Sequence, residues 1–294
     1  MTSRNLALTL LAATTLVAGG AAADATAPKA EKFVIDLAGA RIEADDVIVS
    51  ASLGERDPLL NKPSGKQEEI TLRGGAAMTR DTAKLLEEAF TKECARRVDG
   101  SFAFADKDYG ELSRLTFAWG VVTEVALPSL DVKSKDAATT TLKLQPQFPK
   151  RIVQHGDKVA RGASGPAWTR GSFKLSVDGL DGALKSAQEV GEIRVAQTPS
   201  ASAPVQCSAA TVADLTFAIP TADAGALAAW KDGAARNGSV DYLAADGSSV
   251  VKVKLTGLKK KAQAVDGALT KVTASVGAVA FERGAAKAAS APKK

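Results

Sequence analysis

The two halves of this chain show the same succession of predicted strands and helices. This internal repeat constrains the fold more than any other feature of the sequence. The first half opens with an alternating run at 33–39, and the second opens with a similar run at 173–179. Alternation of apolar and polar residues is typical of a half-buried β-strand. A second strand follows in each half, at 69–73 and at 214–218. We therefore expect two copies of one structural unit, because self-similarity along a chain is the sign of repeated units.

A helix is expected after the second strand of each unit. The first helix is predicted over 81–95 and the second over 222–236. Each carries apolar residues at helical spacing: Leu85, Leu86, Ala89 and Phe90 in the first, Leu227 and Trp230 in the second. The distance along the chain from the first strand to the helix is the same in both units, which supports duplication.

The end of each unit is predicted to be a hairpin followed by one long closing strand. A Gly-Ser pair opens each hairpin, and an acidic turn separates its two strands. The predicted hairpin strands are 100–106 with 115–120 and 238–247 with 251–257, and the closing strands are 139–148 and 272–281. This element order predicts a mainly β chain with some α: two tandem antiparallel β-barrel or sandwich domains, each with one packed helix. The domains are predicted at 33–148 and 172–283, with an exposed linker at 149–171 that contains several Gly and Pro residues.

The first 23 residues are predicted to be a secretory signal peptide. Arg4 precedes an apolar run at 6–18, and small residues follow up to Ala23, after which cleavage is expected. The run is too short for a membrane-spanning helix. We therefore expect a periplasmic or extracellular protein without a membrane span. The segments 24–32 and 284–294 are expected to be a flexible leader and a flexible basic tail.

Composition weighs against nucleic-acid binding and against metal-dependent chemistry. The formal net charge is only +5, and the basic residues are scattered apart from 259–261 and the last two positions. One His and two Cys cannot build a His-rich or Cys-rich metal site. We expect no cofactor, no metal and no nucleic-acid partner.

The polar residues that could carry catalysis have simpler explanations. Paired carboxylates need a cleft and shifted pKa values before they act as acid and base. Solvated faces are therefore expected for Asp36, Asp45, Asp46, Glu87 and Glu88. His155 is expected at the surface of the linker, the Gly-Ser stretches at 162–165 and 171–172 show no nucleophile or phosphate motif, and 259–261 are expected at a solvated hairpin tip. The sequence predicts that the chain is not an enzyme.

Cys94 and Cys207 are a candidate disulfide. Export would place them in a compartment where disulfides persist. The bond would join the two halves of the chain. The alternative, two separate thiols that behave as small buried apolar groups, stays open.

The order of elements in the first unit resembles the tail-tube family, which includes phage tail-tube proteins and the haemolysin-coregulated tube protein of type VI secretion. The resemblance is carried by residues 70–75, the helix with Leu85 and Phe90, and residues 115–131 and 137–144. It covers the first unit well and the second weakly.

The resemblance implies a protein that joins copies of itself into six-fold rings, which stack into tubes. With two units per chain, it implies a ring of three chains joined through unpaired sheet edges. The loop at 52–68 is the candidate stacking arm, with a free solvated loop as the alternative. Family members carry no signal peptide, whereas this chain is predicted to be exported. We therefore expect a secreted or periplasmic ring, tube or fibre rather than part of a contractile injection machine. The rival interpretation is a monomeric periplasmic module that binds a small ligand or a partner between the barrels.

Overall fold

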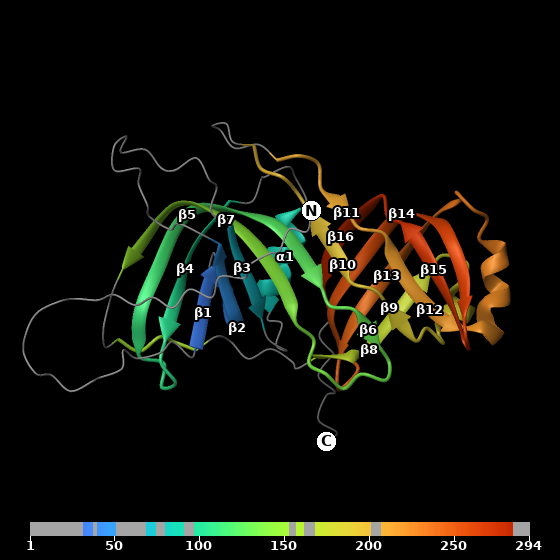
Figure 1. Cartoon of the computed structure of the whole chain (residues 1–294), viewed down its shortest axis with the longest axis horizontal. Coiled ribbons are helices and arrows are strands. Elements are labelled where there is room, and N and C mark those ends of the chain that lie inside the picture. Colours follow the sequence, from blue (N-terminus) through green and yellow to red (C-terminus); the bar gives the residue numbers. More distant parts are fainter. Residues whose placement is uncertain are drawn as a thin grey trace, which may run out of the picture.

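The computed structural model describes residues 32–37, 40–50, 69–74, 80–90, 97–152, 157–161, 168–200 and 207–284. The predicted signal peptide at 1–23, the predicted stacking arm at 52–68, and nearly all of the predicted leader and tail lie outside these residues. Two β-barrels lie side by side along the long axis of the molecule (Figure 1). The predicted fold class is confirmed.

The first barrel is closed by six strands. Their order is β5-β4-β1-β2-β3-β7, and β7 pairs again with β5 to complete the ring of strands. All the pairings are antiparallel. The strands are β1 (Lys32–Leu37), β2 (Ala40–Ser50), β3 (Glu69–Gly74), β4 (Arg97–Ala105), β5 (Glu111–Leu127) and β7 (Thr140–Ile152), with α1 (Arg80–Ala89) between β3 and β4.

The second barrel repeats this order with two added strands, β6 and β16. Its strands follow the order β8-β13-β14-β15-β12-β9-β6, and β16 pairs with the first half of β14. The elements are β6 (Leu130–Asp131), β8 (Trp168–Val177), α2 (Asp181–Leu184), β9 (Glu189–Val190), β12 (Leu215–Pro220), η1 (Thr221–Ala229), β13 (Ala235–Ala244), β14 (Ser249–Asp266), β15 (Leu269–Ser275) and β16 (Ala278–Arg283). Two short strands, β10 (Ile193–Ala196) and β11 (Thr211–Val212), leave this barrel and join the sheet of the first.

The two barrels share their strand register, including two irregularities. In the first hairpin the register shifts between the pairs Gly100–Phe117 and Val98–Gly120. In the second hairpin it shifts between the corresponding pairs, Gly238–Leu255 and Arg236–Leu258. The other edges of β5 and β14 also share a shift, between Val122 and Glu124 in β5 and between Lys260 and Ala262 in β14. A shared register with shared bulges is hard to obtain by coincidence of pattern, because bulges are specific local features.

The bulge itself is built the same way in both units. Trp119 has φ 58° and its N–H donates to the carboxylate of Asp99 at 2.8 Å. Gly257 has φ 66° and its N–H donates to the amide oxygen of Asn237 at 3.3 Å. In each case an Asp or Asn side chain satisfies an N–H that the bulge has freed from the ladder.

One glycine in each hairpin allows a close approach between neighbouring strands. A Cβ at Gly100 would lie 2.6 Å from the carbonyl oxygen of Asp36, and a Cβ at Gly238 would lie 2.5 Å from that of Ser176. Distances this short are not tolerated. The Gly-Ser pairs that the sequence shows therefore mark where β4 meets β1 and where β13 meets β8.

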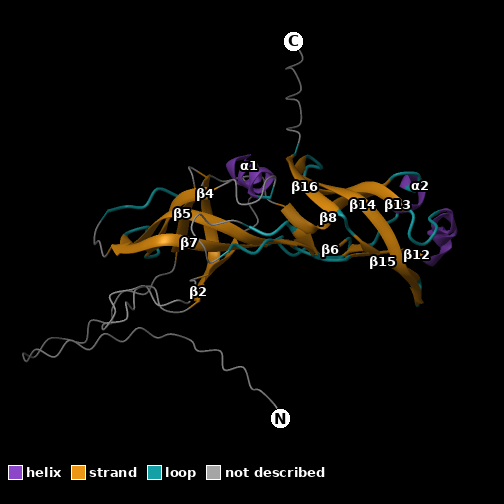
Figure 2. Cartoon of the chain, turned by 90° about the horizontal axis from the view of Figure 1, so that it is seen from above, coloured by secondary structure: helices purple, strands orange, loops and turns teal. Residues whose placement is uncertain are grey.

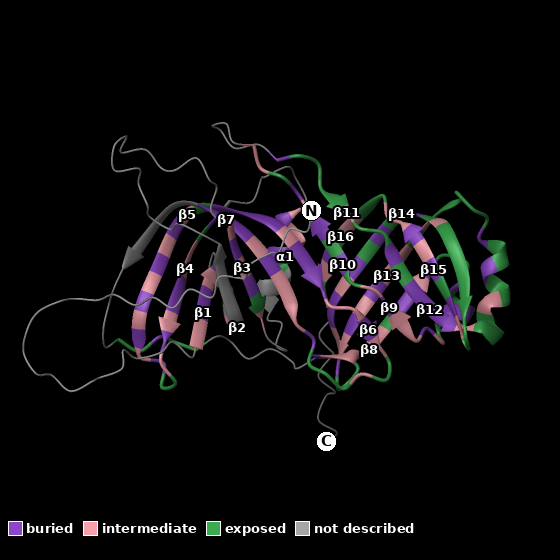
Figure 3. Ribbon diagram, in the orientation of Figure 1, coloured by how far each residue is buried: buried purple, intermediate pink, exposed green. Residues whose placement is uncertain are grey.

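The hydrophobic core is continuous through both barrels. One cluster of buried residues contains Leu37, Phe102 and Leu144 from the first barrel together with Trp168 and Tyr242 from the second. Along β5, buried and less buried residues alternate in bands (Figure 3). Because apolar burial is the main favourable term in folding, the shared core stabilises both barrels and the junction between them.

Two local predictions were wrong. The predicted helix at 222–236 is a 3-10 helix that ends at Ala229, and β13 begins at Ala235. Gly225 weakens a regular helix, and Gly233, with φ 75°, turns the chain. The predicted hairpin tip at 259–261 lies inside β14, which passes the bulge at Gly257 and turns only at 267–268. In the first unit the helix ends at Ala89, and 91–95 lie outside the described residues.

Strand residues occupy both ends of the predicted linker. β7 runs to Ile152, β8 starts at Trp168, and Trp168 is buried. The division into units at 148 and 172 stays a prediction.

Candidate assembly interface

The two units are joined by a strand that one unit adds to the sheet of the other. In the described part of the chain, β4 pairs with β5 as far as Val121. From Glu124 to Leu127 the same edge of β5 pairs with β10 of the second unit, antiparallel, with Ile193 opposite Leu127 and Ala196 opposite Glu124. β11 then pairs with β10 and extends the sheet by one more strand. Strand addition of this kind supplies backbone hydrogen bonds to an edge that is otherwise unpaired.

The added strand is fixed by alternate burial. Ile193 and Val195 are 3% and 1% exposed, while Arg194 between them is exposed. Burial of a full aliphatic side chain contributes about 1.5–3 kcal/mol. β10 is therefore held by packing as well as by its ladder.

Gln197 extends this contact to helix α1. Its backbone N–H donates to Thr123 O at 2.8 Å, continuing the β10–β5 ladder. Its side-chain Nε2 donates to Val122 O at 2.7 Å and to Ala89 O at 3.2 Å. Ala89 is the last residue of α1, and the carbonyls of a final helical turn have no partner inside the helix. One buried side chain of the second unit thus satisfies a helix end and a strand of the first.

Glu124 links three strands across this junction. Its carboxylate lies 3.9 Å from Arg194 on β10 and 3.5 Å from Lys143 on β7. Arg194 also donates to Glu192, and this hydrogen bond, with the charges of Glu192 and Glu124, raises the pKa of the Arg194 guanidinium. Oppositely charged side chains therefore lie next to one another on the outer face of the sheet, with Glu124 between Arg194 and Lys143.

The first unit contributes a segment to the second barrel in return. Between β5 and β7 the chain at 128–138 crosses to the gap between β8 and β9. Leu130 pairs with Val190 of β9, and Ala138 N–H donates to Trp168 O of β8. Arg170 of β8 anchors the segment by donating from Nε to Ser129 O at 2.8 Å and from a terminal nitrogen to Ser129 Oγ at 2.7 Å. The second barrel is therefore closed by residues of the first unit.

Helix α1 completes the junction on one side of the molecule (Figure 2). Its end packs against β16 of the second unit, where the rings of Phe90 and Phe281 lie 6.2 Å apart. Glu87 pairs with Arg283 at 3.3 Å. Glu87 was predicted at a solvated face, and it is a half-buried partner in an inter-unit ion pair.

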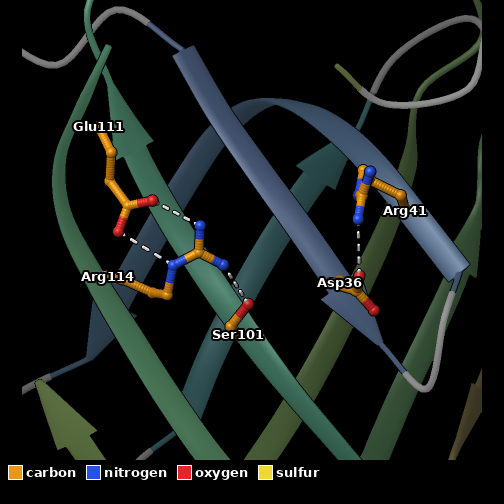
Figure 4. A network of polar contacts seen from close by, with 5 residues as sticks. All are labelled: Asp36, Arg41, Ser101, Glu111 and Arg114. Atoms are coloured by element: carbon orange, nitrogen blue, oxygen red, sulfur yellow. Dashed lines mark hydrogen bonds and ion pairs between the residues drawn. The ribbon is translucent and has the colours of Figure 1, made fainter. Parts of the chain in front are cut away.

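The other predicted polar residues lie in ion pairs or beyond the described part of the chain. Asp36 pairs with Arg41 at 3.3 Å, and nearby Arg114 donates to buried Glu111 and to Ser101 (Figure 4). The hydrogen bond to Glu111 raises the pKa of Arg114. Glu88 lies 3.9 Å from Lys84. The side chains of Asp45 and Asp46 on β2, and all of His155, are outside the described residues.

The lysine run and the second Gly-Ser stretch lie in ordinary strand surroundings. Lys260 pairs with Asp232 at 3.2 Å and Lys261 with Asp214 at 2.8 Å. Gly171 and Ser172 lie inside β8, and 162–165 are outside the described residues. Within the described ranges, no three His, Cys, Asp or Glu side chains gather as metal ligands would, and no helix there has the length and apolar character to cross a bilayer.

Cys207 lies at the same junction. It is buried beside Val121 of β5 and is disulfide-bonded. Cys94 is outside the described residues, so the pairing of Cys94 with Cys207 stays a prediction.

Comparison with known proteins finds similarity only among solved structures. No protein-family model matches the chain, and no curated protein matches it. The structure of Hcp1 from Flavobacterium johnsoniae is similar with a TM-score of 0.31 and 17% identity, over 43% of this chain and 99% of that chain. A chain of an extracellular contractile injection system, the PVC sheath-tube complex in its extended state, is similar with a TM-score of 0.35 and 16% identity, over 45% of this chain and 95% of that chain.

The sequence prediction missed both exchanged segments. Residues 193–196 alternate apolar and polar side chains at Ile193, Arg194 and Val195, and 128–138 contain a short apolar alternation at Leu130 and Val132. Their local signal shows that a strand forms but does not show which sheet receives it.

Proposed function

We propose that this chain is an exported structural protein that assembles with copies of itself into rings or tubes through sheet edges. The observation that carries the proposal is the pairing of β10 with β5. Two similar barrels associate here by strand addition. The contact buries apolar side chains and places Arg194 next to Glu124 on the outer face. Units that join this way inside one chain have the chemistry to join between chains.

The internal contact is heterologous, which favours assembly beyond two units. The first unit offers the β5 edge and the segment 128–138, while the second offers β10 and the gap between β8 and β9. A heterologous contact that repeats either closes into a ring or continues as a filament. We propose a ring of three chains, which would place six similar barrels around one axis.

Export is part of this proposal and rests on the sequence at 1–23. Cleavage after Ala23 would begin the mature chain at Asp24. N-terminal sequencing of the protein recovered from outside the cytoplasm tests this step, and a chain that keeps Met1 would refute it.

Assembly is tested on the purified mature protein by light scattering and negative-stain imaging over a range of concentrations. A mass of several chains with ring-shaped or tubular particles is expected. A single-chain mass at every concentration would refute self-assembly and favour the monomeric binding module.

A further inference from the structure

The shared register of the two barrels shows which segment of β14 corresponds to the edge of β5 that β10 covers. The bulge between Val122 and Glu124 corresponds to the bulge between Lys260 and Ala262. Residues 124–127 of β5 therefore correspond to 262–265 of β14. β10 covers the first set, whereas β13 leaves β14 at Lys259. Among the described residues, no strand pairs with this edge of β14 beyond that point.

Residues 124–127, which β10 covers, and residues 262–265, which no described strand covers on this edge, differ in how far their side chains are buried. Val125, Ala126 and Leu127 are 0%, 4% and 0% exposed under the added strand. Ala262, Gln263, Ala264 and Val265 are all exposed, and Val265 is 66% exposed. The same position in the fold is thus a packed junction in one unit and an open strand in the other.

The open segment lacks the features that keep natural edge strands from pairing. Such edges carry charged residues, proline or a bulge, and 262–265 contain none of these beyond the bulge that also precedes the occupied β5 edge. The flanking charges are exposed, but each already has a partner in its own unit: Lys261 pairs with Asp214 at 2.8 Å and Asp266 pairs with Lys271 at 2.7 Å. Within 262–265 an incoming strand would meet backbone groups and uncharged side chains.

The second unit also lacks the crossing segment of the first. β5 and β7 are joined through 128–138, whereas β14 and β15 are joined by a tight turn at 267–268. The first barrel needs no inserted segment, because β1 pairs directly with β2.

We propose that the edge of β14 at Ala262–Val265 is the site at which a second copy of this chain adds a strand. This inference rests on the proposed self-assembly and names the surface through which it occurs. The contact would repeat between chains the strand addition that β10 makes on β5 within the chain.

The test compares two variants of the full mature chain that each add two lysines at exposed positions. The edge variant carries Ala262→Lys with Ala264→Lys, because lysine on an edge strand opposes pairing. The control carries Ala245→Lys with Thr256→Lys, since Ala245 lies in the β13–β14 turn and both edges of β14 are paired around Thr256. Circular dichroism and thermal melting check that both variants are folded.

Light scattering then gives the concentration at which half of the chains are assembled. We expect the edge variant to raise this concentration about tenfold or more, corresponding to about 1.4 kcal/mol per contact, and the control to match the wild type. Hydrogen exchange of the wild type should slow at 262–265 on assembly. An edge variant that assembles like the wild type, or an edge that stays unprotected in the assembly, overturns the site while self-assembly stands. A wild-type chain that never assembles overturns both.

Discussion

Gln197 offers the sharpest test of how the two units are held together. Its side chain is 6% exposed and donates to two buried carbonyls that belong to the other unit. Replacement by leucine keeps a similar volume but removes both donors. A buried polar group left without a partner costs about 1–3 kcal/mol. The two bonds differ in quality, because the bond to Val122 is 2.7 Å and the bond to Ala89 is 3.2 Å.

We expect Gln197→Leu to lower the free energy of unfolding by about 2 kcal/mol, since the carbonyls keep some solvation and leucine adds apolar contact. Urea unfolding followed by circular dichroism measures this. With an m value of about 3 kcal/mol/M, the upper end of the usual range, the midpoint falls by about 0.7 M.

The matched control is Gln188→Leu. Gln188 is half-buried, and its side chain donates to Ser186 O, two residues away in its own unit. We expect a midpoint change of less than half that of Gln197→Leu. If the urea midpoint falls equally for both variants, or does not change for Gln197→Leu, the inter-unit hydrogen bonds of Gln197 do not hold the junction.

Three further predictions concern the junction and the barrels. Phe281→Ala should lower the free energy of unfolding by about 3–5 kcal/mol, because Phe281 is buried against Phe90 of the other unit. Urea unfolding measures this loss, with Val279→Ala at a half-buried neighbouring position as the control. Equal losses for the two variants would contradict the prediction. Both tyrosines of the chain should resist ionisation, because a hydrogen bond to Glu43 raises the pKa of Tyr109 and burial raises that of Tyr242. The unfolded chain loses these protons near pH 10, so stability should fall as the pH rises above about 10; ultraviolet titration that finds two ordinary phenols in the folded protein would disprove this. Oxidised protein should contain Cys94 joined to Cys207, and peptide mapping of alkylated protein without reductant that finds either thiol free would exclude the bond.

The sequence alone determined the repeated unit and most of its strands. Alternation identified β1, β3, β4, β5 and their counterparts because each strand packs one face inward, and that pattern is local. The Gly-Ser pairs were predicted to open the hairpins, and the structure adds the reason for the glycine, because β4 lies close to β1 and β13 lies close to β8 at these positions. The length of β14 was not predicted, because Gly257 looks like a strand end when only its neighbours along the chain are considered.

Tertiary structure decided which strand joins which sheet. β10 pairs with a strand of the other unit, and 128–138 closes the other barrel, although both lie at ordinary places in the sequence. The backbone ladder is the same for every residue type, so a strand's partner is set by which edge is left open and which apolar face needs covering. Those conditions exist only when both barrels are formed. The same reasoning makes the open edge of β14 visible in the fold and invisible in the sequence.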